Sequence, residues 1–201
     1  MHRTTMRYFD LYDSPHGQML LVASDAGLSG VYFDGQKYFP ETPADWKRDA
    51  RHAPLKQAKR ELAEYFAGKR KRFEVALSPE GTPFQRSVWN AIATVGFGNT
   101  IAYGELAQRA GCPGSARAAG AATGRNPIGI IVPCHRILGS NGSLTGYAGG
   151  LERKCALLAL EGAGTCYPPH NSARCGEPMR DRLRRRHGGP QRRLARSKQA
   201  A

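Results

Sequence analysis

The stretch Ile130-Ile131-Val132-Pro133-Cys134-His135-Arg136-Ile137-Leu138 joins an apolar run to a cysteine and a histidine, and it organises the rest of the chain. The run before Pro133 predicts a short buried strand that ends at the proline, which has no N–H to donate to a β-ladder. Cys134 then lies at a strand end beside His135, whose imidazole favours the thiolate that a nucleophile needs. The alternative is a cysteine that only fills the core.

Length and composition fit a globular protein of one or two small domains. The chain has 201 residues, of which 40% are hydrophobic. It has no apolar run of about 18 residues or more that would span a membrane, and its first residues do not form a signal peptide. We therefore expect a cytoplasmic protein without a membrane partner. Five cysteines without CxxC spacing argue against disulfides and a structural zinc site, so we expect no bound metal.

The formal net charge of +14 is concentrated at the C-terminal end. Residues 165–201 hold ten lysines or arginines against two acidic residues, with too few large apolar side chains for a core. This composition predicts a basic, disordered tail, which either adds salt-sensitive affinity for DNA or has no role. The mildly basic remainder suits a partner with a phosphate backbone, although many basic domains have none.

The N-terminal part has the pattern of a small sheet covered by a helix. Residues 8–14, 18–24 and 28–34 are β-like runs separated by turn chemistry, which predicts a three-stranded antiparallel meander. Residues 35–53 show no period and are interpreted as a loop. Pro54 begins a helical stretch that ends at Gly68, and residues 72–77 are another possible strand. Residues 78–81 are a predicted boundary between two domains.

The next part has the pattern of a helical unit. Thr82 is a predicted N-cap and Pro83 the first position of a helix with an apolar stripe, on which Trp89 is a packing residue. Residues 103–110 and 115–123 predict a helix-turn-helix. The second helix is rich in alanine and glycine, so it can approach DNA closely or simply pack against another helix. Asn-Gly in residues 139–143 predicts a hairpin wing, and residues 151–161 a last helix.

The motifs of this region resemble the O6-alkylguanine-DNA alkyltransferases, also called methylated-DNA-protein-cysteine methyltransferases. The resemblance runs from about Gly81 to Gly162 and rests on the Pro-Cys-His-Arg core, on Asn126-Pro127 and on the segment Tyr147 to Gly150. It implies an α+β fold. A ribonuclease H-like domain with an antiparallel sheet and helix would occupy residues 1–80. A mostly helical, winged helix-turn-helix-like domain, which carries the active site, would occupy residues 81–164. The tail would occupy residues 165–201.

The resemblance also implies a catalytic set. Cys134 would take the alkyl group, and His135 would reach it through water while donating to Glu161, as in a Cys-His-acid triad. A carboxylate in the last turn of a helix is disfavoured by the helix dipole, so Glu161 needs such a partner. Tyr103 would act on the phosphate beside the target and give a proton to the guanine. Asn126 would hold the turn before the cysteine.

The same resemblance assigns the DNA contacts. Arg117 would enter the duplex and fill the space left by a guanine rotated out of the stack. Ala148 stands where other members carry serine, which puts one hydrogen bond to the base in doubt. The remaining candidates are Tyr103, Ala118, Ala121 and Arg125 for DNA, and Tyr147, Ala148 and Gly149 for the base pocket. Arg136 would tie loops together, Cys155 would be a packed thiol and Cys112 a turn residue.

The implied reaction is the irreversible, stoichiometric transfer of an alkyl group from O6-alkylguanine in duplex DNA to Cys134, with O4-alkylthymine left open as a second substrate. No cofactor is needed, and we expect a monomer that is nucleoid-associated when on DNA. One alternative is a non-catalytic alkyltransferase-like protein that only recognises damage, but such proteins replace the cysteine that is present here. The second alternative is a cysteine hydrolase, but that function would not account for Arg117 or for the Ala/Gly-rich helix.

Overall fold

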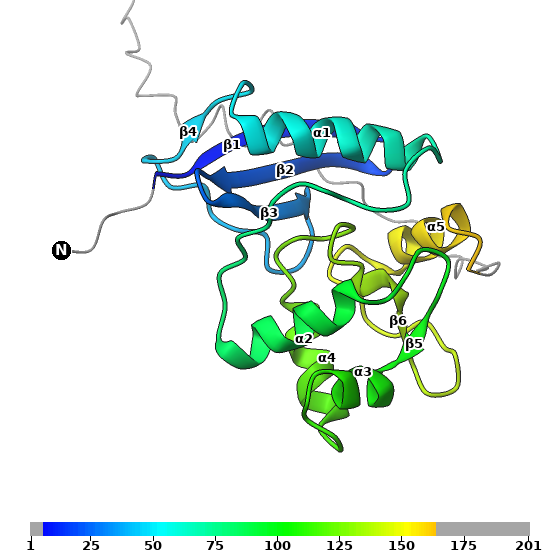
Figure 1. Cartoon of the computed structure of the whole chain (residues 1–201). Coiled ribbons are helices and arrows are strands. Elements are labelled where there is room, and N and C mark those ends of the chain that lie inside the picture. The colour runs from blue at the N-terminus through cyan, green and yellow to red at the C-terminus, as the bar shows by residue number, and fades with distance from the viewer. Residues whose placement is uncertain (1–5, 164–201) are drawn as a thin grey trace, which may run out of the picture.

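The computed structural model describes residues 6–163 and has a sheet with its helix above a group of shorter helices (Figure 1). The predicted meander is present, because each run pairs antiparallel with the next through the turns that the sequence predicts. The sheet order is β3-β2-β1-β4, with the last pair parallel. The strands are β1 (Tyr8–Ser14), β2 (Gly17–Ser24), β3 (Gly27–Phe33) and β4 (Lys47–Arg48).

Both faces of the central strand β2 are covered. Met19 and Leu21 face the main core, which includes Leu55 and Leu62 of α1 (Ala53–Phe66). Leu20 and its neighbours on the other face lie in a smaller cluster that Phe39 and Trp46 of the following segment cover. Strand β2 therefore reads as a nearly continuous apolar run, as strands buried on both faces do.

Two predictions for the N-terminal part are wrong. Residues 35–53 contain a short strand, β4, since Lys47 and Asp49 donate their N–H groups to the free edge of β1. Residues 72–77 do not form a strand and contribute only an isolated bridge at Leu77. The buried carboxylate of Glu61 accepts the N–H groups of Glu74 and Val75, so this backbone is satisfied by a side chain in place of a ladder.

The helical part contains the predicted helix pair. Thr82 caps α2 in a capping box with Gln85, and Trp89 of α2 donates its Nε1–H to the carbonyl oxygen of Ala122 in α4 at 2.9 Å. The elements are α2 (Pro83–Ala93), β5 (Ile101–Ala102), α3 (Tyr103–Arg109), α4 (Ala116–Gly124), the 3₁₀ helix η1 (Cys134–Arg136), β6 (Ile137–Leu138) and α5 (Leu151–Leu160).

The prediction of a buried strand before Pro133 is wrong. Residues 129–132 form a turn in which Ile130 has a φ of 70°, and the N–H of Val132 donates to the carbonyl oxygen of Ile128. The strand comes after the cysteine, where β6 pairs parallel with β5. The Asn-Gly turn forms, with a hydrogen bond from Gly139 N–H to Ser143, but its flanks do not pair as a β-hairpin.

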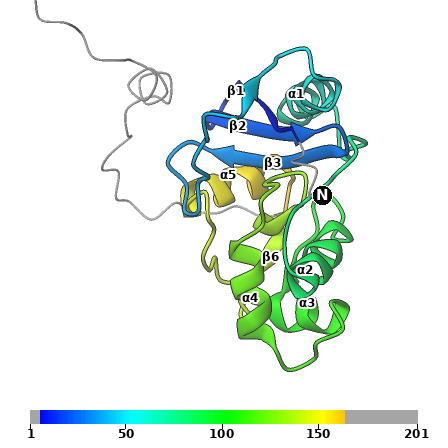
Figure 2. The same cartoon turned by 90° about the vertical axis from the view of Figure 1, so that its left-hand side faces the viewer.

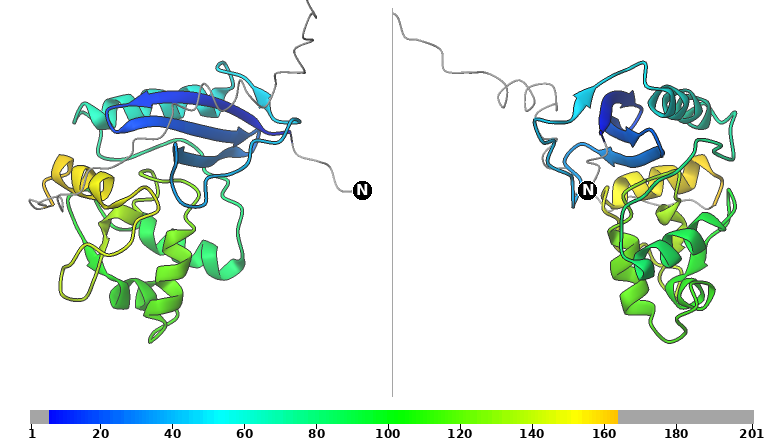
Figure 3. Two further views of the ribbon diagram at one scale, coloured as in Figure 1. Left: turned by 180° about the vertical axis from the view of Figure 1, so that it is seen from behind. Right: turned by 60° about the vertical axis from the view of Figure 1, so that its left-hand side comes forward.

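Helix α5 lies between the two parts of the molecule. Figures 2 and 3 show it directly beneath the sheet and above α2, α3 and α4. Its buried residues are Lys154, Cys155, Leu157 and Leu158. Among residues 6–163 no helix is long and apolar enough to cross a membrane. The predicted tail lies outside the described residues.

The capping box gives a stability prediction. Thr82→Ala removes the side-chain acceptor of an otherwise unpaired N–H at the start of α2, so we expect the free energy of unfolding to fall by about 1 kcal/mol. Urea unfolding followed by circular dichroism measures this. Thr82→Ser keeps the hydroxyl and should stay close to the parent protein; equal losses in both variants would contradict the role of the cap.

Candidate active site

Cys134 lies at the start of η1 with only 6% of its surface exposed. The Asn126 amide holds it there. Its Nδ2 donates to the Val132 carbonyl oxygen at 2.8 Å and to the Cys134 Sγ at 3.2 Å, while its Oδ1 accepts the N–H of Ile128 at 3.1 Å. One buried amide thus satisfies both ends of the turn and contacts the sulfur. The backbone forms a turn here because the Asn126 side chain makes the hydrogen bonds that a neighbouring β-strand would otherwise make.

His135 and Glu161 meet behind the cysteine. The Nε2 of His135 lies 2.9 Å from Oε1 of Glu161, and both side chains are fully buried. Glu161 occupies the C-cap position of α5. The other ring nitrogen, Nδ1, is buried and has no hydrogen-bond partner within residues 6–163. A buried nitrogen left in this state is a place for a bound water or a substrate proton.

Glu161 accepts hydrogen bonds from four different residues. Arg136 donates from Nε at 2.7 Å and from Nη2 at 2.8 Å, Tyr65 donates its hydroxyl at 2.7 Å, and Gly98 donates its N–H at 3.3 Å. Tyr65 belongs to α1, so the bond joins the N-terminal part to the site. The sequence analysis missed Tyr65 and Gly98, because neither residue type nor spacing marks a partner that is distant along the chain.

The protonation states follow from burial and these bonds. Burial by itself would raise the pKa of Glu161, but the hydrogen bonds from His135 and Arg136 outweigh it and hold that pKa far below its usual range. Burial raises the pKa of the Cys134 thiol and lowers the pKa of His135. The resting site therefore holds a thiol, a neutral imidazole and a carboxylate. The expected imidazole-favoured thiolate is thus not the resting state.

Lys154 is a third residue that the sequence analysis missed. It is fully buried, and its Nζ donates to the carbonyl oxygens of Ile137 at 2.6 Å and Thr145 at 2.8 Å. Its charge works against the effect of burial on the Cys134 pKa. A signal was available, because Lys154 precedes Leu157, Leu158 and Glu161 by three, four and seven residues and so shares their buried helix face.

A cavity of about 630 Å³ lies between α4, the loop at Tyr38 and the segment at Tyr147. Tyr103 and Tyr147 line it, and both lie close enough to Cys134 for a charge on the sulfur to raise their pKa further, after burial as the main cause. The volume is within the ~300–1,000 Å³ typical of small-ligand sites. The cavity adjoins the Ala/Gly-rich helix α4, which contributes Ala116, Gly120 and Ala121 to its lining.

The other predicted residues lie around this cavity in different ways. Arg117, Ala121 and Ala148 line it, whereas Ala118 is exposed on α4 and Arg125 is exposed just after that helix. Gly149 is buried beneath the Tyr147 ring, where an added Cβ would lie 2.7 Å from the ring, so only glycine fits. Cys155 is buried in α5 and Cys112 is half-buried in the turn before α4.

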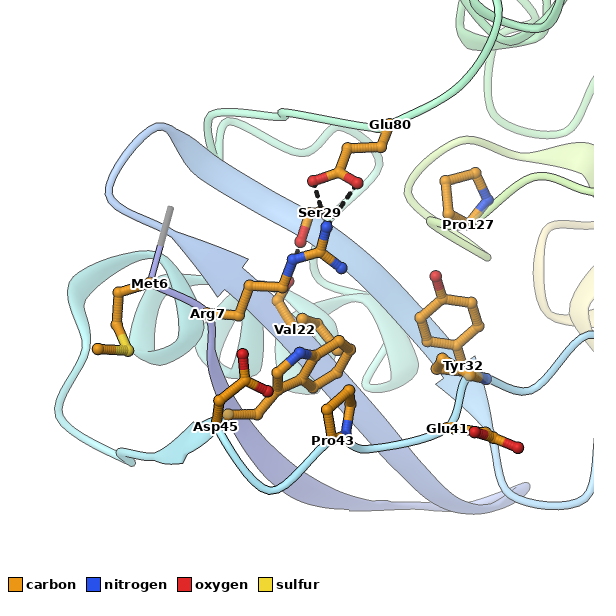
Figure 4. Close-up of a pocket in the computed structure, with 12 residues that line it drawn as sticks. Met6, Arg7, Val22, Ser29, Tyr32, Glu41, Pro43, Asp45, Glu80 and Pro127 are labelled. Atoms are coloured by element: carbon orange, nitrogen blue, oxygen red, sulfur yellow. Dashed lines mark hydrogen bonds and ion pairs between the residues drawn. The ribbon is translucent and has the colours of Figure 1, made fainter. Parts of the chain in front are cut away.

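A larger cavity, of about 860 Å³, lies in the N-terminal part. Figure 4 shows the ion pair between Arg7 and Glu80 on one wall and Tyr32 on another. Neither Tyr103 nor Tyr147, whose pKa values respond to a charge on Cys134, lines this larger cavity. Within residues 6–163, no cluster of three or more histidine, cysteine or acidic side chains is arranged to hold a metal ion. The chemistry therefore belongs to the smaller cavity.

Comparison with known proteins gives one family. Residues 83–163 match the DNA-binding domain of 6-O-methylguanine DNA methyltransferase, and residues 7–79 match its ribonuclease-like domain. A methylated-DNA–protein-cysteine methyltransferase of Methanosarcina acetivorans is 48% identical over 156 residues, covering 78% of this chain and 99% of the relative. One from Mycolicibacterium paratuberculosis is 46% identical over 149 residues, covering 74% and 88%.

Solved structures agree. The crystal structure of Mycobacterium tuberculosis O6-methylguanine methyltransferase has a TM-score of 0.71 and 44% identity, covering 79% of this chain and 94% of that one. A Mycobacterium tuberculosis structure in complex with DNA has the same TM-score and 42% identity, covering 78% and 93%. The expected α+β arrangement of a sheet domain followed by a helical DNA-binding domain is therefore confirmed.

The buried carboxylate gives a prediction about acid stability. The lowered pKa of Glu161 contributes stability that is complete above the carboxyl's unfolded value of 4.5 and is lost as the pH falls through the lower folded value. The parent protein should therefore lose unfolding free energy steeply between about pH 5 and pH 3, and Glu161→Gln should lose less over that interval. Denaturant titrations at each pH measure both. Parallel pH profiles would contradict the assignment.

Proposed function

The chain belongs to the 6-O-methylguanine DNA methyltransferase family, and on that premise we infer that it repairs O6-alkylguanine in duplex DNA by moving the alkyl group to Cys134. The observation that carries the inference is the position of Cys134, which is near enough to Tyr103 and Tyr147 of an open cavity for its charge to affect them and is followed in the chain by His135, hydrogen-bonded to Glu161. Its relatives are methyltransferases that use a protein cysteine as acceptor, and DNA is the partner of the helical domain.

The transfer is a displacement at the alkyl carbon. The Cys134 sulfur forms a bond to that carbon while the bond from carbon to guanine O6 breaks. Because the resting thiol and imidazole are both neutral, the thiol proton passes to His135, through a water at the unpartnered Nδ1. Glu161, already ionised, stabilises the imidazolium that forms.

The leaving guanine needs a proton of its own. Burial raises the pKa of Tyr103, so its phenol is protonated at neutral pH and is a competent donor at the cavity wall. Guanine then departs as a neutral base. The thioether left on Cys134 has no good leaving group, so each protein molecule acts once, and the reaction requires no cofactor.

The lesion reaches the cysteine by leaving the base stack. A guanine inside a duplex cannot enter a cavity in the protein, so the nucleotide must rotate out, which costs a few kcal/mol of unstacking. Helix α4 presents small residues at its exposed positions, Ala118 and Ala121, and lets the backbone approach the minor groove. Arg117, exposed on the same helix at the edge of the cavity, fills the vacated space.

The same reasoning gives the remaining assignments. Asn126 positions the nucleophile, and Tyr147, Ala148 and Gly149 bound the base. Arg125 contacts the DNA strand. Residues 1–80 form the sheet domain and residues 81–164 the catalytic domain, and the protein acts as a monomer on DNA in the cytoplasm or nucleoid.

Mass spectrometry tests the acceptor. Incubation with a duplex that carries O6-methylguanine should add one methyl group to the peptide that contains Cys134, and Cys134→Ser should remain unmodified while still binding the duplex. Binding without a mass change in the parent protein would point to damage recognition only. Small released products without protein modification would point to hydrolysis.

Arg117 has its own prediction. Arg117→Ala should slow repair of the duplex by at least tenfold more than it slows the reaction with free O6-benzylguanine, since only the duplex needs its base extruded. Single-turnover rates with both substrates measure the ratio. Equal losses with the two substrates would contradict the role of Arg117 in extrusion.

A further inference from the structure

A loop of the N-terminal part, residues 36–39, forms one side of the cavity that holds the active site. Lys37 and Tyr38 line this cavity together with Arg117 of α4. Hydrogen bonds hold the loop to its two neighbouring segments. The N–H of Lys37 donates to the carbonyl oxygen of Ala148 at 3.0 Å, and the N–H of Phe33 at the end of β3 donates to the side-chain Oε1 of Gln36 at 2.9 Å. The loop therefore has a fixed position against the segment that bounds the base pocket.

Tyr38 in this loop has an unusual conformation. Its φ is 60°, in the left-handed region, which residues with a large side chain seldom adopt. Its side chain is nevertheless 48% exposed, so burial of the ring does not explain why a tyrosine occupies this position. A backbone outlier at the mouth of an active site suggests that the side chain is presented to a ligand.

Two cationic side chains lie over the Tyr38 ring. The Nζ of Lys37 lies 5.0 Å and the Cζ of Arg125 lies 4.8 Å from the ring centroid. Both are exposed, and neither forms an ion pair with an acidic side chain within residues 6–163. Arg117, at the same cavity, also lacks an ion pair within that range. The mouth therefore carries three cations without counter-ions, and such a group attracts an anion.

The two parts of the chain contribute to this arrangement together. Lys37 and Tyr38 come from the sheet domain, whereas Arg125 follows the helix that carries the small residues. A single domain would thus present only half of it. The anion that reaches this mouth in the proposed reaction is the phosphodiester on either side of the extruded nucleotide.

We propose, on the basis of the proposed function, that Lys37 and Arg125 bind the phosphate backbone of the lesion-bearing strand at the nucleotide that enters the cavity. The Tyr38 ring, which both cations approach, is the wall against which the sugar of that nucleotide packs. The sheet domain thereby contacts the substrate directly. Lys37 and Tyr38 become binding residues of a site whose chemistry lies entirely in the other domain.

Salt dependence of binding tests the phosphate contact. In a Cys134→Ser background, which prevents reaction, the affinity for an O6-methylguanine duplex is measured over a range of salt concentrations. Lys37→Gln should reduce the slope of log affinity against log salt by about 0.9, the value for one phosphate contact on duplex DNA. Lys56→Gln, an equal change of charge at an exposed position of α1 away from the cavity, should leave the slope unchanged.

Reaction rates in otherwise unaltered protein separate substrate contact from loop structure. Lys37→Gln should slow repair of the duplex several-fold more than the reaction with free O6-benzylguanine, which has no phosphate. Tyr38→Asn removes the ring, and asparagine tolerates the left-handed conformation, so the loop is retained. It should also lower the ratio of the duplex rate to the free-base rate.

The outcomes are distinct. A parent protein that modifies Cys134 with neither substrate would refute the proposed function itself. A parent protein that repairs the duplex, together with Lys37→Gln and Tyr38→Asn variants that keep its rate ratio and salt slope, would overturn only the phosphate site. Equal losses with the duplex and the free base would also overturn it, because they would show a loop that merely supports the cavity.

Discussion

The buried carboxylate of Glu161 joins several segments of the chain at the candidate active site. Glu161 lies at the end of α5, where the helix dipole disfavours an anion, and inside a core, where an unpaired charge is costly. It is tolerated because Arg136, His135, Tyr65 and Gly98 all donate to it. These donors come from three other segments, so the carboxylate fixes how α1, the loop at Gly98 and the turn of the cysteine meet.

This arrangement explains how a neutral site can produce a nucleophile. Burial keeps the Cys134 thiol and the His135 imidazole uncharged in the resting protein. The negative charge is instead stored on Glu161, where strong donors stabilise it. Proton transfer from sulfur to imidazole then creates a cation beside an existing anion, which is less costly than separating charge in a core.

The sheet domain contacts the site at two places. Tyr65 of α1 donates a hydrogen bond to Glu161. Lys37 and Tyr38 line the cavity, and the N–H of Lys37 donates to the carbonyl oxygen of Ala148. Helix α5 of the helical domain lies beneath the sheet, as Figure 2 shows, and it carries Lys154 and ends next to Glu161. The two domains therefore form one functional unit, because the nucleophile, its hydrogen-bonded support and the opening of the cavity all depend on contacts between them.

The meander, the covering helix, the capped start at Thr82, the helix pair and the Cys-His motif could all be predicted from the sequence, because each depends on residues close together in the chain. Apolar character before Pro133 was misleading, since the Asn126 side chain, not a neighbouring strand, satisfies that backbone. The donors that surround Glu161 and the loop that borders the cavity could be seen only in the folded chain. The donors lie 25 to 96 residues from Glu161, and long-range packing alone brings them to it.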